Sequence, residues 1–233
     1  MPSGRRLLIT AGPTHEPIDE VRYLANRSSG RLGLCLAQAA RDTGWHVTLL
    51  LGPIAAAPPP GVHTVHFEST AQLAGLLDEH FPRSDVLIMA AAVADYRPMR
   101  TDPAKLPRTD KPLVLTLEPT PDLVAACSAR KRPGQRIIGF ALEDPGQLAA
   151  RARQKLERKA LDAIVANPLE TMGADSIAAT VYTASGEICQ PSREPQYAAS
   201  ASPSQRADQR PVHMSKSDFA RWLMNWLATP AAR

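Results

Sequence analysis

The chain has 233 residues, with 27 Lys and Arg against 23 Asp and Glu for a formal charge of +4, and three scattered cysteines. The odd cysteine count favours neither a disulfide framework nor a zinc site, and the aromatic content of 5% leaves little for stacking nucleic-acid bases. No apolar run approaches the roughly 18 residues of a membrane helix. We therefore expect one domain over 1–233, located in the cytoplasm and binding neither nucleic acid nor membrane.

The first predicted strand is the apolar run Leu7-Leu8-Ile9, which is followed by Gly12-Pro13 and so ends where a loop begins. That loop extends to about Ser28, whereas roughly 2–6 residues usually connect a strand to its helix, and such long loops are usually functional or disordered. Disorder is disfavoured because the loop is rich in specific chemical groups. It carries two prolines and four polar or charged side chains: Glu16, Asp19, Arg22 and Asn26.

A helix is predicted from about Gly30 to Thr43, with apolar residues at helical spacing and a stop at Gly44. Its start combines free backbone N–H groups, a serine cap from Ser28-Ser29, and two glycines, Gly30 and Gly33. This combination suits an anion, most naturally a phosphate. An ordinary helix cap with two packing glycines fits the same pattern.

An NAD site is disfavoured by the position of these glycines. A dinucleotide fingerprint places its glycines directly after the first strand and an acidic residue about 20 positions on, at the end of the second strand. Here the glycines come late, and the second predicted strand, 46–51, ends in Leu51-Gly52-Pro53 with no acidic residue.

The remaining elements alternate between strands and helices, which predicts an α/β fold: a Rossmann-like open, mainly parallel sheet with helices on both faces and a late β-hairpin. Strands are expected at 63–67, 85–93, 113–117, 137–141 and 163–166, helices at 69–80, from 121, at 145–159 and 215–227, and the hairpin at 178–188.

Three other segments carry functional expectations. Ligands of open α/β sheets bind beyond the carboxyl ends of the strands, so Ala90 to Asp95, after the continuous apolar strand, should line a pocket. The polar, proline-rich segment 97–111 is predicted to be a mobile flap, and the Ser-, Ala- and Pro-rich segment 190–211 a disordered insert. The basic outer face of the 145–159 helix is expected to be solvated.

The run Thr10-Ala-Gly-Pro-Thr-x-Glu-Pro-Ile-Asp-x-Val-Arg-Tyr-x-x-Asn-x-Ser-Ser-Gly-x-x-Gly33 resembles the phosphopantothenoylcysteine synthetase family, a coenzyme A pathway ligase often fused to a decarboxylase in bacteria. Five further matches follow in the same order along most of the chain: Ala90-Ala-Ala-Val-Ala-Asp95-Tyr96, Lys105, Pro119-Thr-Pro-Asp122, Ile138-Gly-Phe140-Ala141 and Asp162-x-Ile-Val-Ala-Asn167.

The resemblance implies ligation of 4′-phosphopantothenate to L-cysteine through an acyl-cytidylate, with CTP as co-substrate and Mg²⁺ as cofactor. It also implies a homodimer whose active site is completed across the interface. Because the chain starts at the first ligase strand, we expect a separate phosphopantothenoylcysteine decarboxylase in the pathway. The catalytic residues implied are Asn26, Arg22 and Lys105, and the nucleotide-binding residues are Gly12, Ser28, Ser29, Gly30, Ala92, Asp95, Lys105, Phe140 and Asn167. The metal ligands are left open.

Two positions depart from the family pattern. The usual Lys-Ile-Lys-Lys of the flap is Lys105-Leu-Pro-Arg108, and the usual Asn-Asp is Asn167-Pro168. These departures keep a non-catalytic or divergent nucleotide- or phosphate-binding paralogue open as an alternative. An NAD(P)-dependent Rossmann oxidoreductase is the other alternative.

Overall fold

The computed structural model describes residues 4–191 and 212–229, so the predicted insert lies outside the described residues from 192 onward. In the described part, one eight-stranded sheet has the order β13-β12-β10-β9-β6-β1-β4-β5. Its strands are β1 (Arg6–Ala11), β4 (His46–Leu51), β5 (His63–His66), β6 (Val86–Met89), β9 (Arg136–Glu143), β10 (Ala163–Pro168), β12 (Thr180–Thr183) and β13 (Ile188–Cys189).

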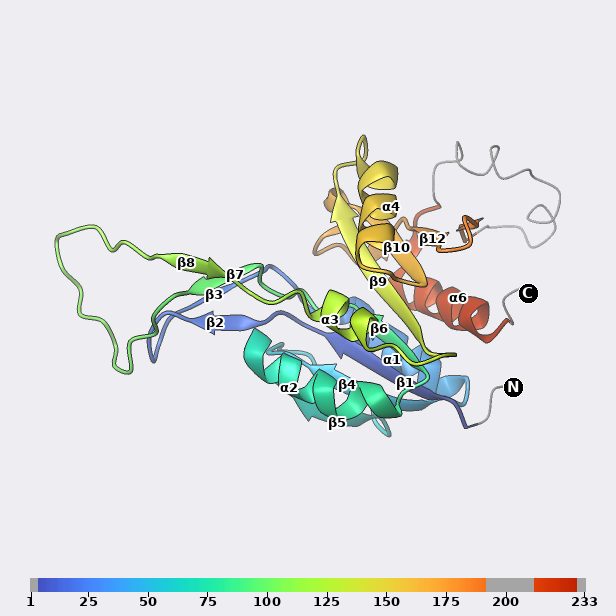
Figure 1. Cartoon of the computed structure of the whole chain (residues 1–233), viewed down its shortest axis with the longest axis horizontal. Helices are drawn as coiled ribbons and strands as arrows, with labels where there is room; N and C mark the ends of the chain where they lie inside the picture. The colour runs from blue at the N-terminus through green and yellow to red at the C-terminus, as the bar shows by residue number, and fades with distance from the viewer. Residues whose placement is uncertain (1–3, 192–211, 230–233) are drawn as a thin grey trace.

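The strands from β5 across to β10 run parallel, and β12 and β13 add an antiparallel edge. The helices cover both faces (Figure 1). They are α1 (Arg31–Asp42), α2 (Thr70–His80), α3 (Leu123–Ala129), α4 (Leu148–Arg158) and α6 (Lys216–Ala228), with short 3-10 helices η1 (Phe81–Arg83) and η2 (Leu169–Thr171). The predicted α/β fold with its late hairpin is confirmed.

The core has one apolar layer on each face of the sheet, because side chains alternate along the strands. Leu7 and Ile9 of β1 pack with Leu36 of α1 and Phe219 of α6 on one face. Leu8 points to the other face, where α2, α3 and α4 contribute their apolar sides. Among the described helices, none is long and apolar enough to cross a membrane.

An arm extends from the body at the carboxyl ends of the strands (Figure 1). It consists of residues 15–25, with β2 (His15–Pro17) paired to β3 (Tyr23–Ala25), and residues 96–119, with β7 (Tyr96–Pro98) paired to β8 (Leu117–Pro119). The structure has a further two-stranded ribbon, in which β11 (Ser176–Ile177) pairs with β14 (Met214–Ser215).

Two predicted strands were misplaced. The strand expected at 85–93 ends at Met89, because β9 pairs with β6 only as far as Ile88 and the later residues keep a neighbour on one side only. The strand expected at 113–117 is instead β8, which begins at Leu117. Val114 is 84% exposed, so the alternating apolar residues of this segment do not pack against the core.

Candidate functional site

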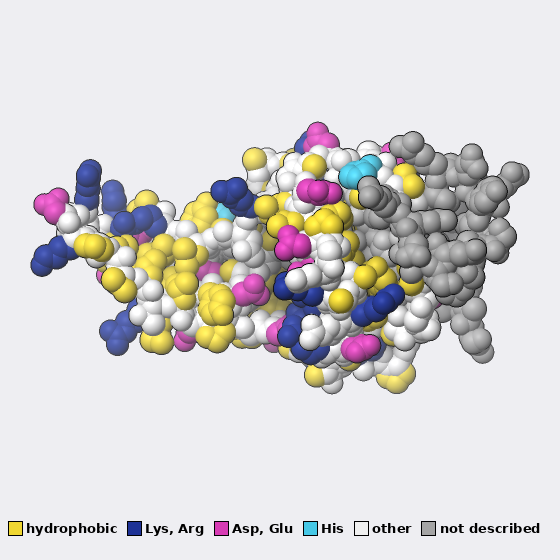
Figure 2. All heavy atoms as spheres, turned by 90° about the horizontal axis from the view of Figure 1, so that it is seen from above, with side chains coloured by type: hydrophobic (Ala, Val, Ile, Leu, Met, Phe, Trp, Pro, Cys, Tyr) yellow, Lys and Arg dark blue, Asp and Glu magenta, His cyan; other side chains and the backbone are white. Residues whose placement is uncertain are grey.

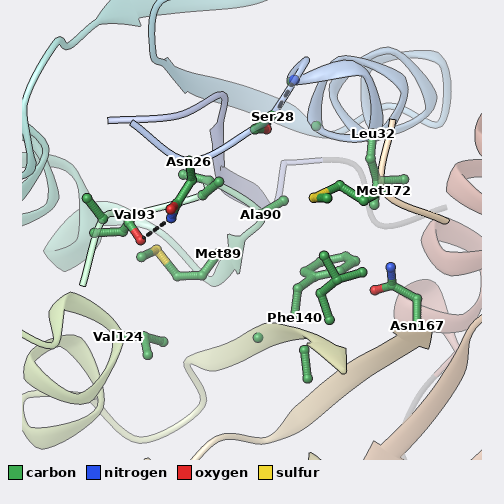
Figure 3. Close-up of a pocket in the computed structure, with 18 of the residues that line it drawn as sticks. Asn26, Ser28, Leu32, Met89, Ala90, Val93, Val124, Phe140, Asn167 and Met172 are labelled. Carbon is green, nitrogen blue, oxygen red and sulfur yellow. Dashed lines mark hydrogen bonds between the residues drawn. The ribbon is translucent and has the colours of Figure 1, made fainter. Parts of the chain in front are cut away.

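A cleft of about 940 Å³ lies beyond the carboxyl ends of β6, β9 and β10, between the start of α1 and the end of α4 (Figure 3). Residues 90–95 form part of its wall, as predicted. The structure brings most of the predicted site residues to this cleft: Asn26, Ser28, Ser29, Gly30, Ala92, Asp95, Phe140 and Asn167.

The start of α1 forms one wall without the predicted serine cap. The N-cap is Gly30 in the left-handed conformation (φ 67°), with no side-chain hydrogen bond capping the helix, and Ser28 Oγ instead accepts from the Gly30 N–H at 3.3 Å. A side chain at Gly30 would be strained, and its Cβ would lie 2.9 Å from Ile54 Cδ1. The free N–H groups and the helix dipole make this end suitable for an anion.

Two cations stand beside this helix start. Arg31, the first residue of α1, pairs with Asp175, and Lys216 reaches the cleft from the start of α6. The Lys216 position depends on β14 pairing with β11 and on its own N–H, which donates to the Asp175 carbonyl at 3.2 Å. Burial lowers the pKa of Lys216, and the charge of Arg31 lowers it further. A bound anion would relieve the repulsion between these cations.

Sequence reasoning missed Lys216, since nothing near it in the chain belongs to the cleft. The expectation of a solvated basic face on α4 holds in part, because Arg151, Arg153 and Arg158 are exposed. It missed that Lys155, Arg158 and Lys159 line the opposite wall of the cleft. Lys155 Nζ lies 2.6 Å from Glu143 Oε1, and Lys159 Nζ lies 2.9 Å from Asp122 Oδ2. In the described part of the chain, Arg158 has no such carboxylate partner.

The carboxyl groups of Glu143 and Asp122 both have a pKa below the ordinary value for their residue type. Burial alone would raise the pKa of Glu143, but hydrogen bonds from Lys155 and Arg151 outweigh it and hold the pKa below its ordinary value. The pKa of Asp122 is lowered in the same way by Lys159, against the opposing effect of burial. On this wall of the cleft Lys155 and Lys159 are thus paired with carboxylates, whereas Arg158 has no carboxylate partner among the residues that the structure describes.

Asn26 projects into the cleft from the long loop after β1. Its Nδ2 donates to the Val93 carbonyl at 2.9 Å, which fixes the amide against the wall formed by residues 90–95 (Figure 3). An amide nitrogen carries two hydrogens, so a second donor remains for a ligand. The sequence neighbours Glu16 and Asp19 do not face the cleft and are almost completely buried. Glu16 accepts from the Thr70 N–H at 2.9 Å, at the start of α2.

The structure does not bring Arg22 and Lys105 to the cleft of their own chain; both lie on the arm. Arg22 Nε donates to Asp19 Oδ2 at 2.9 Å, and its Nη2 donates to the Leu106 carbonyl at 2.8 Å. The Leu106 N–H in turn donates to Asp19 Oδ2 at 3.1 Å. The Arg22 hydrogen bond holds the pKa of Asp19 far below its ordinary value, although burial opposes this. Lys105 is exposed next to this junction.

Gly12 does not line the cleft, but its backbone supports Ala92, which does. Gly12 adopts a left-handed φ of 83°, and its carbonyl accepts from the Ala92 N–H at 2.9 Å. A Cβ on Gly12 would lie 3.2 Å from the backbone of Gly52, so the close approach also favours glycine.

The arm exposes an apolar surface. Figure 2 shows hydrophobic side chains gathered over it, next to scattered basic ones. Exposed apolar patches of this kind mark interaction sites more often than ordinary surface. The large exposed side chains on the two arm segments are Val21, Tyr23, Tyr96, Met99, Leu113, Val114 and Leu117.

A dedicated metal cage is not formed: among the described residues, no group of three or more His, Cys, Asp and Glu side chains could hold a metal ion. Mg²⁺ in phosphate sites is usually bound through one or two carboxylates together with substrate phosphates. Asp95 lines the cleft with an exposed carboxylate, whereas Asp122 is paired with Lys159. This donor set fits a Mg²⁺ that arrives with a nucleotide.

The family model described as "DNA/pantothenate metabolism flavoprotein C-terminal domain" matches residues 2–202. The chain belongs to this family. The predicted relationship to the phosphopantothenoylcysteine synthetases is thereby confirmed, since the similar proteins include bifunctional proteins of coenzyme A biosynthesis.

Two curated proteins are similar to this chain. One, named Cysteine/Cysteine sulfinic acid decarboxylase, from an unknown prokaryotic organism, is 43% identical over 173 residues, which are 74% of this chain and 48% of that protein. The other, Coenzyme A biosynthesis bifunctional protein CoaBC of Vibrio vulnificus, is 38% identical over 193 residues, which are 80% of this chain and 48% of that protein. The chain spans about half the length of these relatives.

The fold of the family is also seen in a solved structure, the crystal structure of the C-terminal domain of Coenzyme A biosynthesis bifunctional protein CoaBC. It superposes on this chain with a TM-score of 0.76 at 32% identity, covering 97% of this chain and 94% of that one.

Proposed function

We propose that this domain is a phosphopantothenate–cysteine ligase of coenzyme A biosynthesis, which uses CTP and forms an acyl-cytidylate. The observation that supports it most is the cleft, where a helix start suited to phosphate, cations of α4 and α6, and the donor Asn26 face one another in a member of this family. The names of the relatives support the pathway. The reaction is proposed to be cytoplasmic, with its product consumed by a phosphopantothenoylcysteine decarboxylase.

In the first step, a carboxylate oxygen of phosphopantothenate attacks the α-phosphorus of CTP. The bond from that phosphorus to the bridging oxygen breaks, and pyrophosphate leaves with the electron pair. The free N–H groups in the first turn of α1, together with Arg31 and Lys216, are placed to hold phosphate oxygens against this build-up of negative charge. A Mg²⁺ held by the phosphates and Asp95 would supply further positive charge.

In the second step, the cysteine amine attacks the acyl carbonyl and CMP leaves, while the amine loses its proton. Negative charge develops on the carbonyl oxygen before the leaving group departs. The N–H of Asn26 that is not bound to Val93 is an uncharged donor suited to that oxygen. The amide product then carries the cysteine carboxylate and thiol.

We infer that a second copy of the chain completes each cleft. The arm carries Arg22 and Lys105 away from their own cleft and exposes a large apolar surface, which a second arm would cover. Arg22 has a planar fork suited to carboxylate or phosphate, and Lys105 is a point charge on a flexible side chain, suited to a triphosphate. The proposed unit is therefore a homodimer with shared sites.

The deciding experiment incubates the protein with phosphopantothenate, cysteine and Mg²⁺, with CTP or ATP in parallel, and measures pyrophosphate and product mass. We expect phosphopantothenoylcysteine, with CTP consumed faster than ATP. Equal turnover with both nucleotides would contradict the choice of CTP but not the reaction. Nucleotide binding without pyrophosphate release would favour the divergent paralogue, to which Pro107 and Pro168 point because they stand where the family has other residues.

A further inference from the structure

The cleft contains one aromatic surface on which a nucleotide base could stack. Among the described residues that line it, Phe140 of β9 is the aromatic one. Phe140 pairs in register with Val165 of β10, and Asn167 follows two residues later on the same strand. Residues two apart on a strand face the same way, so Phe140 and Asn167 lie on the same side of the sheet. Bases stack on aromatic rings regardless of sequence, and their identity is read by polar groups at their edges.

The orientation of the Asn167 amide follows from a chain of two hydrogen bonds. The Pro168 carbonyl can only accept, and it lies 2.7 Å from Thr171 Oγ1, so the Thr171 hydroxyl gives its single hydrogen to Pro168. Thr171 Oγ1 can then only accept from Asn167, at 2.9 Å, which requires Nδ2 at that contact. The Asn167 Oδ1 is left for the cleft, and Figure 3 shows it on the side of Phe140.

We propose that Asn167 reads the base through Oδ1 and selects one with an exocyclic amine, and that Thr171 is the positioning residue that keeps this oxygen toward the cleft. This rests on the proposed function in one respect, which is that a nucleoside triphosphate occupies the cleft. An amide oxygen accepts a hydrogen bond from the amine of cytosine or adenine. It meets a carbonyl oxygen in uracil or guanine, where two acceptors face each other without a hydrogen.

Thr171 is suited to this role because it is buried and held by its own short helix. Its side chain is only slightly exposed, and η2 places its hydroxyl three residues after the Pro168 carbonyl that it binds. Without the hydroxyl, neither face of the Asn167 amide is preferred, so the amide can rotate and offer either oxygen or nitrogen. Selectivity between amino and keto bases should therefore disappear while stacking on Phe140 remains.

The test measures dissociation constants by titration calorimetry for CTP, UTP, ATP and GTP, so that each comparison is made between bases of one size. For the wild-type protein we expect CTP to bind about 10- to 100-fold more tightly than UTP, and ATP more tightly than GTP, because an unpaired or opposed polar group costs about that much. Thr171→Val should bring the CTP-to-UTP ratio within about 3-fold, and Thr171→Ser, which keeps the hydroxyl, should restore it.

A structural role alone would weaken all four nucleotides together and leave the ratio unchanged. A ratio retained in Thr171→Val would overturn the positioning role. Equal binding of CTP and UTP by the wild-type protein would overturn the base selection even if the valine variant did not fold. Absence of binding by all four nucleotides would overturn the proposed function, and this inference with it.

Discussion

Replacing Asn26 with alanine should separate the two half-reactions. The side chain offers one amide N–H to the Val93 carbonyl and keeps the second for a ligand in the cleft. The groups placed against the phosphates, Arg31, Lys216 and the start of α1, are not touched by the substitution. Activation of the carboxylate should therefore continue, whereas attack by cysteine loses a donor to its developing oxyanion.

The size of the effect follows from the loss of a single donor. Removing one such group costs roughly 2.7–4 kcal/mol of transition-state stabilisation, which slows the second step by about 10²–10³. The fold should tolerate the change, because Asn26 is exposed and water can replace it at the Val93 carbonyl. Each site should thus consume one CTP quickly and then turn over slowly.

Quenched-flow sampling with mass spectrometry tests this directly. Asn26→Ala should release a burst of one pyrophosphate per site and accumulate phosphopantothenoyl-cytidylate, which cysteine discharges slowly. Asn225→Ala, at an exposed position of α6 outside the cleft, is the matched control and should show wild-type rates in both steps. If the Asn26 variant forms no acyl-cytidylate, Asn26 serves nucleotide binding or loop structure, and its assignment to the second step is wrong.

Three other outcomes are expected. Lys216→Met should weaken CTP binding by about 10-fold in calorimetry, as loss of a charged hydrogen bond does. Arg221→Met on the same helix should leave the dissociation constant unchanged. If both variants weaken CTP binding equally, Lys216 does not belong to the site. Hybrid dimers of Asn26→Ala and Lys105→Ala chains should recover about half of wild-type activity, because one of their two clefts is then intact; no recovery would mean that Lys105 serves its own chain or none. Asp19→Asn should lower the urea midpoint of unfolding at pH 7. The difference in midpoint from wild type should narrow as the pH falls below 3.8, the ordinary pKa of Asp, because the stabilisation from a lowered pKa is lost as that carboxylate is protonated. A difference in midpoint that does not change with pH would contradict this.

Local patterns predicted the elements whose neighbours impose a regular environment. His46 to Leu51 was placed correctly because β1 pairs with it along its whole length and β5 pairs with it from Thr48 onward. The strand predicted to begin at Asp85 was too long, because Ala90 to Val93 are apolar residues typical of a buried strand although no strand of the sheet pairs with them on both sides. The end of β6 is set by where β9 stops pairing, and that is a property of the sheet rather than of the segment.

The site shows the same division. The loop around Asn26 and Ser28 was predictable from its own composition and from family resemblance. Lys216 was not, because it enters the cleft only through the pairing of β14 with β11, about 40 residues away in the chain. Sequence also could not place Arg22 and Lys105 on an arm that leads away from their own cleft, since that depends on how two separate loops pair.

The arm is joined by a buried carboxylate, and this constrains how Lys105 can act. Asp19 accepts from the N–H groups of Val21, Arg22 and Leu106 as well as from the Arg22 side chain, so the two arm segments meet at one ion. Leu106 is therefore tied to the first segment immediately beside Lys105. Bending at this position would leave a buried carboxylate short of donors, which is costly. Movement of Lys105 toward the triphosphate of its own chain would therefore require the arm to move as a unit, whereas the proposed docking of a second copy would offer Lys105 to the partner's cleft with this junction intact.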